Sequence, residues 1–141
     1  HPRVRRQRQM CIRDSFIIDD FLEMKERRKI MPNTVSNMIY QFAQQLKSIF
    51  GAHLSKVIVY GSYARGEYQE NSDVDVMILV DLPEEEIKSK ENMVYDVAFD
   101  IEMKTGVDIS PVIKNEVQYE YWVDVLPYYR NVREEGVVVN E

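Results

Sequence analysis

The sequence predicts an α/β sandwich in which helices flank one small mixed sheet. Three observations predict this fold class. A helical apolar repeat comes first, two β-branched apolar runs follow it, and a long segment with one apolar side precedes a third such run. This order, helix and then strand, loop, strand, helix and strand, is typical of layered domains with helices packed on a sheet.

The first half of the chain alternates one clear helix with two clear strands. Apolar side chains recur at helical spacing over about residues 34–50, and Gly51 marks the end of that helix. Residues 16–30 are also predicted to be helical, although they lack a clear apolar stripe. Residues 54–60 and 74–80 predict buried strands, and the turn-forming residues 61–73 between them predict a loop with room for a helical turn.

The second half predicts a long helix, an edge strand and two short helices. The helix covers about residues 83–104, because Pro83 suits a first turn and Gly106 suits an exit. Residues 107–113 predict a strand, and Pro111 indicates either an edge strand or an early end of the strand. Short helices near 115–122 and 127–135 and an apolar end at 137–139 follow. Aromatic residues of these helices are expected to pack on the sheet, with a partner-binding surface as the alternative; they are Tyr119, Tyr121, Trp122, Tyr128 and Tyr129.

Composition limits the broad class of protein. The chain has 141 residues, 45% hydrophobic and 30% charged, which fits one soluble globular domain and excludes collagen and low-complexity disorder. The single cysteine, Cys11, cannot form an internal disulfide. No apolar run is long enough for a bilayer, and the first residues do not resemble a signal peptide. We therefore expect a cytoplasmic protein with no membrane partner.

Charge is distributed unevenly. Residues 1–15 hold five arginines against one aspartate, a net charge of +4. Because the whole chain carries −6, residues 16–141 carry −10. An acidic body disfavours extensive nucleic-acid binding, which needs basic surface. Residues 1–15 are expected to be a disordered or non-native tail, and residues 16–141 to form a single domain.

One segment combines groups suited to phosphate and metal chemistry. It reads Gly61-Ser62-Tyr63-Ala64-Arg65-Gly66, then five residues, then Ser72-Asp73-Val74-Asp75. Gly61 lets the backbone approach a ligand, and Ser62 offers a hydroxyl and an amide to a phosphate oxygen. Asp73 and Asp75 alternate along a strand, so their carboxylates point to one face and repel each other unless a cation lies between them. Oxygen ligands of this kind favour magnesium or manganese.

The whole string resembles the G-S-x-A-R-G-x5-S-D-x-D signature of the minimal nucleotidyltransferases, within the DNA polymerase beta-like superfamily. The match is gap-free, and the resemblance extends from about residue 34 to the end of the chain. It implies the nucleotidyltransferase fold and an enzyme that transfers a nucleoside monophosphate from a nucleoside triphosphate, such as ATP, to an acceptor. It also implies two magnesium ions, or manganese, held by the paired aspartates and a third carboxylate on a neighbouring strand.

Asp108 is the candidate for that third carboxylate, because it lies on the strand predicted after the long helix. Asp96 and Asp100 are rivals by residue type, but both fall in the predicted helix. Arg65 either neutralises triphosphate charge or clamps a carboxylate of the protein. Ser72 either contacts the nucleotide or caps the entry to the strand.

These residues predict a metal-dependent nucleotidyltransferase. Asp73, Asp75 and Asp108 are the expected catalytic and metal-binding residues, and Gly61, Ser62, Arg65 and Ser72 the expected nucleotide-binding residues. The resemblance implies that AMP is moved to a tyrosine of a HEPN-type toxin, which makes the chain an antitoxin. Two alternatives stay open: a non-catalytic antitoxin that acts by complex formation, and transfer to a small molecule.

Overall fold

The computed structural model describes residues 33–67 and 72–140 of the chain. The expected tail at 1–15 and the helix expected at 16–30 lie outside the described residues. In chain order the elements are α3 (Asn33–Phe50), the 3-10 turn η1 (Gly51–His53), β1 (Leu54–Tyr60), α4 (Ser62–Arg65), β2 (Val74–Val80), α5 (Glu84–Thr105), β3 (Ile109–Asn115), α6 (Glu116–Trp122), α7 (Pro127–Glu135) and β4 (Val137–Val138). No helix in this described part is long and apolar enough to cross a membrane.

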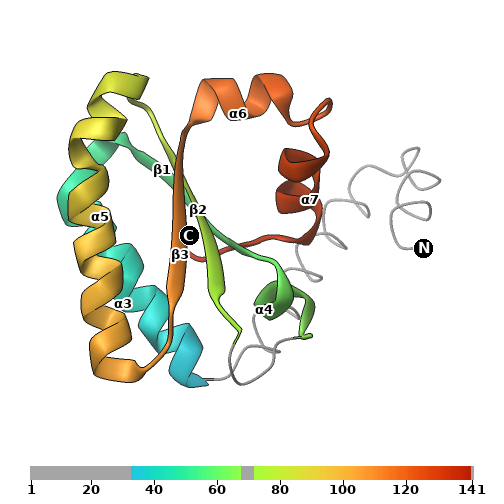
Figure 1. The fold of residues 1–141 in the computed structure, drawn as a ribbon. Helices are drawn as coiled ribbons and strands as arrows, with labels where there is room; N and C mark the ends of the chain where they lie inside the picture. Colours follow the sequence, from blue (N-terminus) through green and yellow to red (C-terminus); the bar gives the residue numbers. More distant parts are fainter. Residues whose placement is uncertain (1–32, 68–71, 141) are drawn as a thin grey trace.

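The four strands form one mixed sheet between two layers of helices. Their order is β3-β2-β1-β4, with β2 and β3 parallel and β1 antiparallel to both of its neighbours. Helices α3 and α5 lie on one side of the sheet and α6 and α7 on the other (Figure 1). Because both faces are covered, the central strands need apolar side chains on both faces, which explains their nearly continuous apolar runs. The predicted α/β sandwich is therefore confirmed.

Each face of the sheet has its own apolar core. Successive residues of β2 point to opposite faces, so Val74, Val76, Ile78 and Val80 pack with α3 and α5. Phe42 and Leu46 of α3 are fully buried in that cluster. The smaller cluster on the other face joins the sheet to α6 and α7; it contains Ile58, Met77, Leu79, Tyr119, Val123, Tyr129 and Val132.

Local signals fixed the long helix α5. Its first turn holds Glu84, Glu85 and Glu86, which suit the positive end of the helix dipole, and Pro83 precedes it in extended conformation. Gly106 follows it in the left-handed conformation with a φ of 77°. Both ends lie one residue after the predicted 83 and 104, and Pro83 precedes the first turn instead of lying in it.

The third strand begins two residues later than predicted. It covers Ile109–Asn115 rather than 107–113, so its last residues are the polar Lys114 and Asn115. An edge strand tolerates polar residues because one side has no neighbouring strand. The position of Pro111 inside β3 is compatible with this edge, as predicted.

The aromatic residues near the end of the chain divide into two groups. Tyr119 and Tyr129 are buried in the smaller core, as expected. Tyr121, Trp122 and Tyr128 remain exposed, with exposed fractions of 71%, 38% and 45%. The expectation that these residues pack on the sheet is therefore wrong for Tyr121 and Trp122, which are exposed and contact each other. Tyr128 is exposed as well, but its ring also meets Tyr60 of β1.

Candidate active site

The candidate site lies where β1 ends and β2 begins, on the face of the sheet that carries α6 and α7. Asp75 is the second residue of β2, opposite Tyr60 of β1 and beside Ser110 of β3. Asp75 is half-buried and Asp73 is exposed. By strand alternation both carboxylates share the face of Met77, which belongs to the smaller core.

Asp108 joins this pair from the residue directly before β3, and not from within the strand as predicted. Its carbonyl oxygen accepts a 2.9 Å hydrogen bond from the backbone N–H of Val74, which fixes Asp108 beside the start of β2. Ser110, two residues further on, donates a long 3.5 Å hydrogen bond from its hydroxyl to Oδ2 of Asp73. The rival residues Asp96 and Asp100 are exposed on α5, the helix that packs on the opposite face.

Electrostatics reflect the crowding of these carboxyl groups. Partial burial raises the pKa of Asp75, and the charge of Asp73 raises it further. The positive charge of Arg65 acts in the opposite direction. Burial, the charge of Asp73 and a hydrogen bond with its carboxyl group raise the pKa of Asp108. Asp73 therefore acts on both of the other carboxyl groups, and all three belong to one cluster.

The donor set fits a divalent cation in its chemistry. Carboxylate oxygens are the ligands that magnesium and manganese prefer, and a cation relieves the repulsion that raises these pKa values. Within residues 33–67 and 72–140, no three acidic, histidine or cysteine side chains already converge in a metal-binding arrangement.

Gly61 shapes the other wall of the site. It has a φ of 78° and a ψ of −151°, a conformation that is nearly confined to glycine. A Cβ atom at this position would collide with Oδ2 of Asp75. Because position 61 has no side chain, the Asp75 carboxylate can lie directly against the turn. This contact joins the part of the motif that begins at Gly61 to the part that contains Asp75. Ser62 follows as the first residue of the short helix α4 and is half-buried, as is Ser72.

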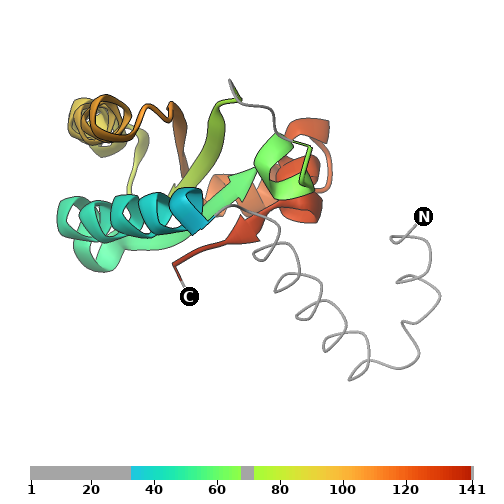
Figure 2. The ribbon, with the colours of Figure 1, turned by 90° about the horizontal axis from the view of Figure 1, so that it is seen from below.

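Arg65 fastens α4 to α7. Its guanidinium donates to Glu67 and to Glu135, each at 3.0 Å, and Figure 2 shows α4 beside α7. Sequence reasoning had left a carboxylate clamp open as one role of Arg65, and these ion pairs provide one. Glu135 could not be assigned to the site from the sequence, because it lies 70 residues away.

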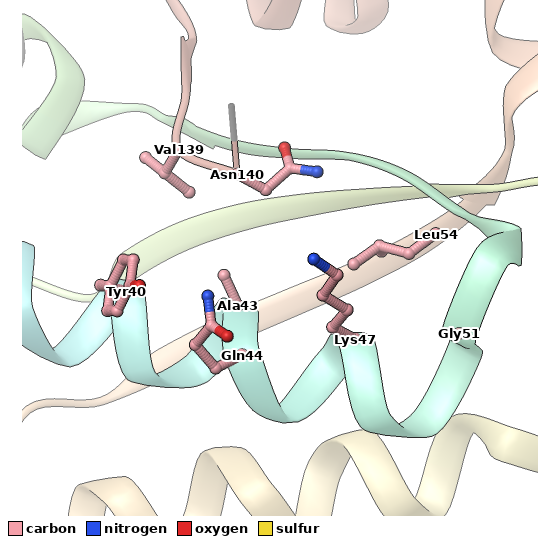
Figure 3. A pocket seen from close by; sticks show the side chains of 8 residues that line it. All are labelled: Tyr40, Ala43, Gln44, Lys47, Gly51, Leu54, Val139 and Asn140. Carbon is pink, nitrogen blue, oxygen red and sulfur yellow. The ribbon is translucent and has the colours of Figure 1, made fainter.

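Sequence reasoning also missed Tyr60 and Ser110. Strand alternation was the available signal: Tyr60 directly precedes Gly61, and Ser110 lies two residues after Asp108 and so shares its side of the chain. A cavity of about 450 Å³ lies elsewhere, between α3 and the β1–β4 side of the sheet (Figure 3). Its lining includes Lys47 and Asn140 but none of the candidate site residues.

Comparison with known proteins defines the class. The family model for the nucleotidyltransferase domain matches residues 39–138, so this chain belongs to the nucleotidyltransferase family. The enzyme class predicted from the sequence motif is thereby confirmed.

Individual relatives narrow the comparison. Two proteins of Methanocaldococcus jannaschii, each named "putative protein adenylyltransferase", are 34% identical to this chain. One aligns over 101 residues, which are 72% of this chain and 93% of the relative. The other aligns over 96 residues, which are 67% of this chain and 94% of the relative. A crystal structure described as a "putative nucleotidyltransferase" from Sulfolobus solfataricus has a TM-score of 0.51 and 18% identity, covering 82% of this chain and 85% of that one. That structure supports the fold.

Proposed function

We propose that this chain is a metal-dependent nucleotidyltransferase that moves AMP, or another nucleoside monophosphate, from a nucleoside triphosphate to a hydroxyl group of a protein partner. The observation that carries this proposal is the cluster of Asp73, Asp75 and Asp108 on one sheet face, packed against the Gly61 turn. Family membership supports the reaction class. The names of the two archaeal relatives support a protein acceptor.

We assign the roles of these residues from their chemistry and their place at the site. Asp73 and Asp75 would bridge two magnesium ions, with manganese as a substitute, and Asp108 would complete the site and take the proton of the acceptor hydroxyl. The bound ions would supply charge stabilisation at the attacking and leaving oxygens. Gly61 and Ser62 would receive the outer phosphates at the turn. Ser72 would add a hydroxyl, and Arg65, although paired with Glu67 and Glu135, would add positive charge near the triphosphate.

The acceptor is proposed to be a tyrosine of a HEPN-type toxin. The body of the chain, at −10 without residues 1–15, disfavours a nucleic-acid acceptor. Exposed apolar side chains on and after α6 offer a surface for a protein instead; they include Val117, Tyr121 and Val125, with exposed fractions of 72%, 71% and 61%. The same surface also favours the second candidate, an antitoxin that neutralises its partner by binding alone.

One experiment separates these two functions. The chain is mixed with the protein encoded beside it, ATP and Mg²⁺, and the intact mass of the partner is measured. We expect an increase by whole AMP units that disappears with Asp73→Ala and persists with Asp96→Ala, an exposed aspartate on α5. A partner that stays unmodified but is neutralised in a stoichiometric complex would establish the binding function and overturn the enzymatic one.

A further inference from the structure

A pair of tyrosines connects the site to α7. Tyr60, the last residue of β1, lies opposite Asp75 in the sheet and packs on the face that carries α7. Its hydroxyl lies 2.5 Å from the hydroxyl of Tyr128, and the two rings meet edge to face with centroids 5.9 Å apart. The phenol of Tyr128 is therefore held against the strand pair that carries Asp75.

Tyr128 is also accessible. Its exposed fraction is 45%, whereas Tyr60 is half-buried between the sheet and α7. The other exposed tyrosines of the described residues lie elsewhere. Tyr40 lines the cavity beside α3, Tyr95 is on α5, and Tyr121 packs its ring on Trp122. Tyr128 thus combines a partly exposed side chain with a hydroxyl that contacts Tyr60, the residue opposite Asp75 in the sheet.

We propose that Tyr128 is an acceptor within the chain itself, so that the protein adenylylates its own Tyr128 hydroxyl. This inference rests on the proposed nucleotidyltransferase function and adds an acceptor to it. The phenolic oxygen of Tyr128 forms a bond to the α-phosphorus of ATP, and the bond from that phosphorus to the oxygen that bridges to the β-phosphate breaks. Pyrophosphate leaves with the electron pair, and the phenolic proton passes through a site carboxylate to water.

The geometry favours a reaction within one chain. Tyr129 and Val132 anchor α7 in the core on this face, and one ion pair from Arg65 to Glu135 links α7 to α4, so Tyr128 keeps its place without a second molecule. A tethered acceptor does not have to diffuse to the nucleotide, and intramolecular placement of this kind accelerates bond formation strongly. The rate should therefore be independent of protein concentration.

The test uses the full chain with ATP and Mg²⁺, intact mass measurement and peptide mapping. We expect one AMP per chain, on Tyr128. The modified fraction should fall at least about tenfold with Tyr128→Phe, which retains the ring contacts, and stay unchanged with Tyr121→Phe, a matched exposed tyrosine of the preceding helix. An Asp73→Ala chain incubated with the wild-type chain should stay unmodified, because the transfer is intramolecular.

Several results would overturn this proposal. AMP on Tyr60 or Tyr121, modification that persists in Tyr128→Phe, or modification of the Asp73→Ala chain by the wild-type chain would each contradict it. Pyrophosphate release or AMP transfer to the partner without any self-modification would refute Tyr128 as an acceptor and leave the proposed function intact. Absence of both reactions would refute both.

Discussion

The two faces of the sheet differ in how completely helices cover them. On one face, α3 and α5 have 18 and 22 residues and bury every side chain that β2 directs toward them. On the other face, α6 and α7 have only 7 and 9 residues, and Asp75 at the start of β2 stays half-buried. On one side β2 thus supplies a continuous core. On the other side it begins with Asp75, which follows Asp73 on that face, before the buried Met77 and Leu79. The first face stabilises the fold, and the start of the second keeps carboxyl groups within reach of solvent.

The largest predicted effect concerns the fully covered face. Phe42→Ala should lower the free energy of unfolding by about 3–5 kcal/mol, because this fully buried ring fills the core between α3 and the sheet. Tyr40→Ala, two residues away and 60% exposed, should change it by no more than about 0.5 kcal/mol. Urea unfolding monitored by circular dichroism measures both. Equal losses would contradict the assignment of this face as the main core.

A second prediction concerns the open face. Asp108→Asn should slow AMP transfer by ~10²-fold or more, the scale for loss of a general base, while nucleotide binding is largely kept. Asp100→Asn, on the opposite side of the sheet, should leave the rate unchanged. Single-turnover kinetics with the protein partner provides the measurement. Full activity of the Asp108 variant together with a loss in the Asp100 variant would transfer the role to Asp100.

Two glycines with nearly the same φ sharpen the comparison further. Gly106→Ala should destabilise the fold by about 1–2 kcal/mol, because its φ of 77° lies in the left-handed region. Gly61→Ala should destabilise it more, because a φ of 78° with a ψ of −151° is nearly confined to glycine and the new Cβ would collide with Asp75. Only the Cβ at position 61 meets Asp75, whereas nothing lies within 4 Å of one at position 106. We therefore expect transfer to fall by about tenfold or more in Gly61→Ala alone. Comparable transfer rates in the two variants would show that the Gly61 turn has no part in the transfer reaction.

The smallest effect concerns pH. The pKa of Asp75 lies above its ordinary value of 3.8, so this group stabilises the metal-free fold below about pH 4, and the contribution is lost as pH rises through the higher folded pKa. Asp75→Asn should consequently raise the urea midpoint at pH 7 and change it little at pH 3. The exposed control Asp96→Asn should show no such difference between the two pH values. A lower midpoint for Asp75→Asn at pH 7 would reverse the sign and contradict the crowding of the carboxyl groups.

Sequence patterns predicted the central strands well because both lie between helices. A strand that is buried on both faces is apolar at nearly every position, so a run such as 54–60 is recognised as a strand without an alternating pattern. β1 and β2 begin and end where expected. The start of β3 was missed by two residues, since an edge strand accepts polar residues and so loses its apolar boundary. Propensity also could not decide which tyrosines face water, because that depends on how α6 and α7 are turned on the sheet.

The same contrast holds for the candidate site. Spacing along one strand sufficed to place Asp73 and Asp75 on one face, and the motif named Gly61. Contacts between distant segments were beyond the sequence: the ion pair of Arg65 with Glu135 and the hydroxyl contact of Tyr60 with Tyr128 join residues 70 and 68 positions apart. Both depend on the packing of α7, which only the folded structure establishes.

Calorimetric titration with ATP, with and without Mg²⁺, tests the central claim most directly. The claim is that the carboxylates of the open face form a metal-dependent nucleotide site. In the wild-type chain, Mg²⁺ should strengthen ATP binding, and the Asp73→Ala/Asp75→Ala double variant should lose this dependence. A double variant of equal charge change on α5, Asp96→Ala/Asp100→Ala, should retain it. Undiminished Mg²⁺-dependent binding by the Asp73→Ala/Asp75→Ala chain would contradict the account.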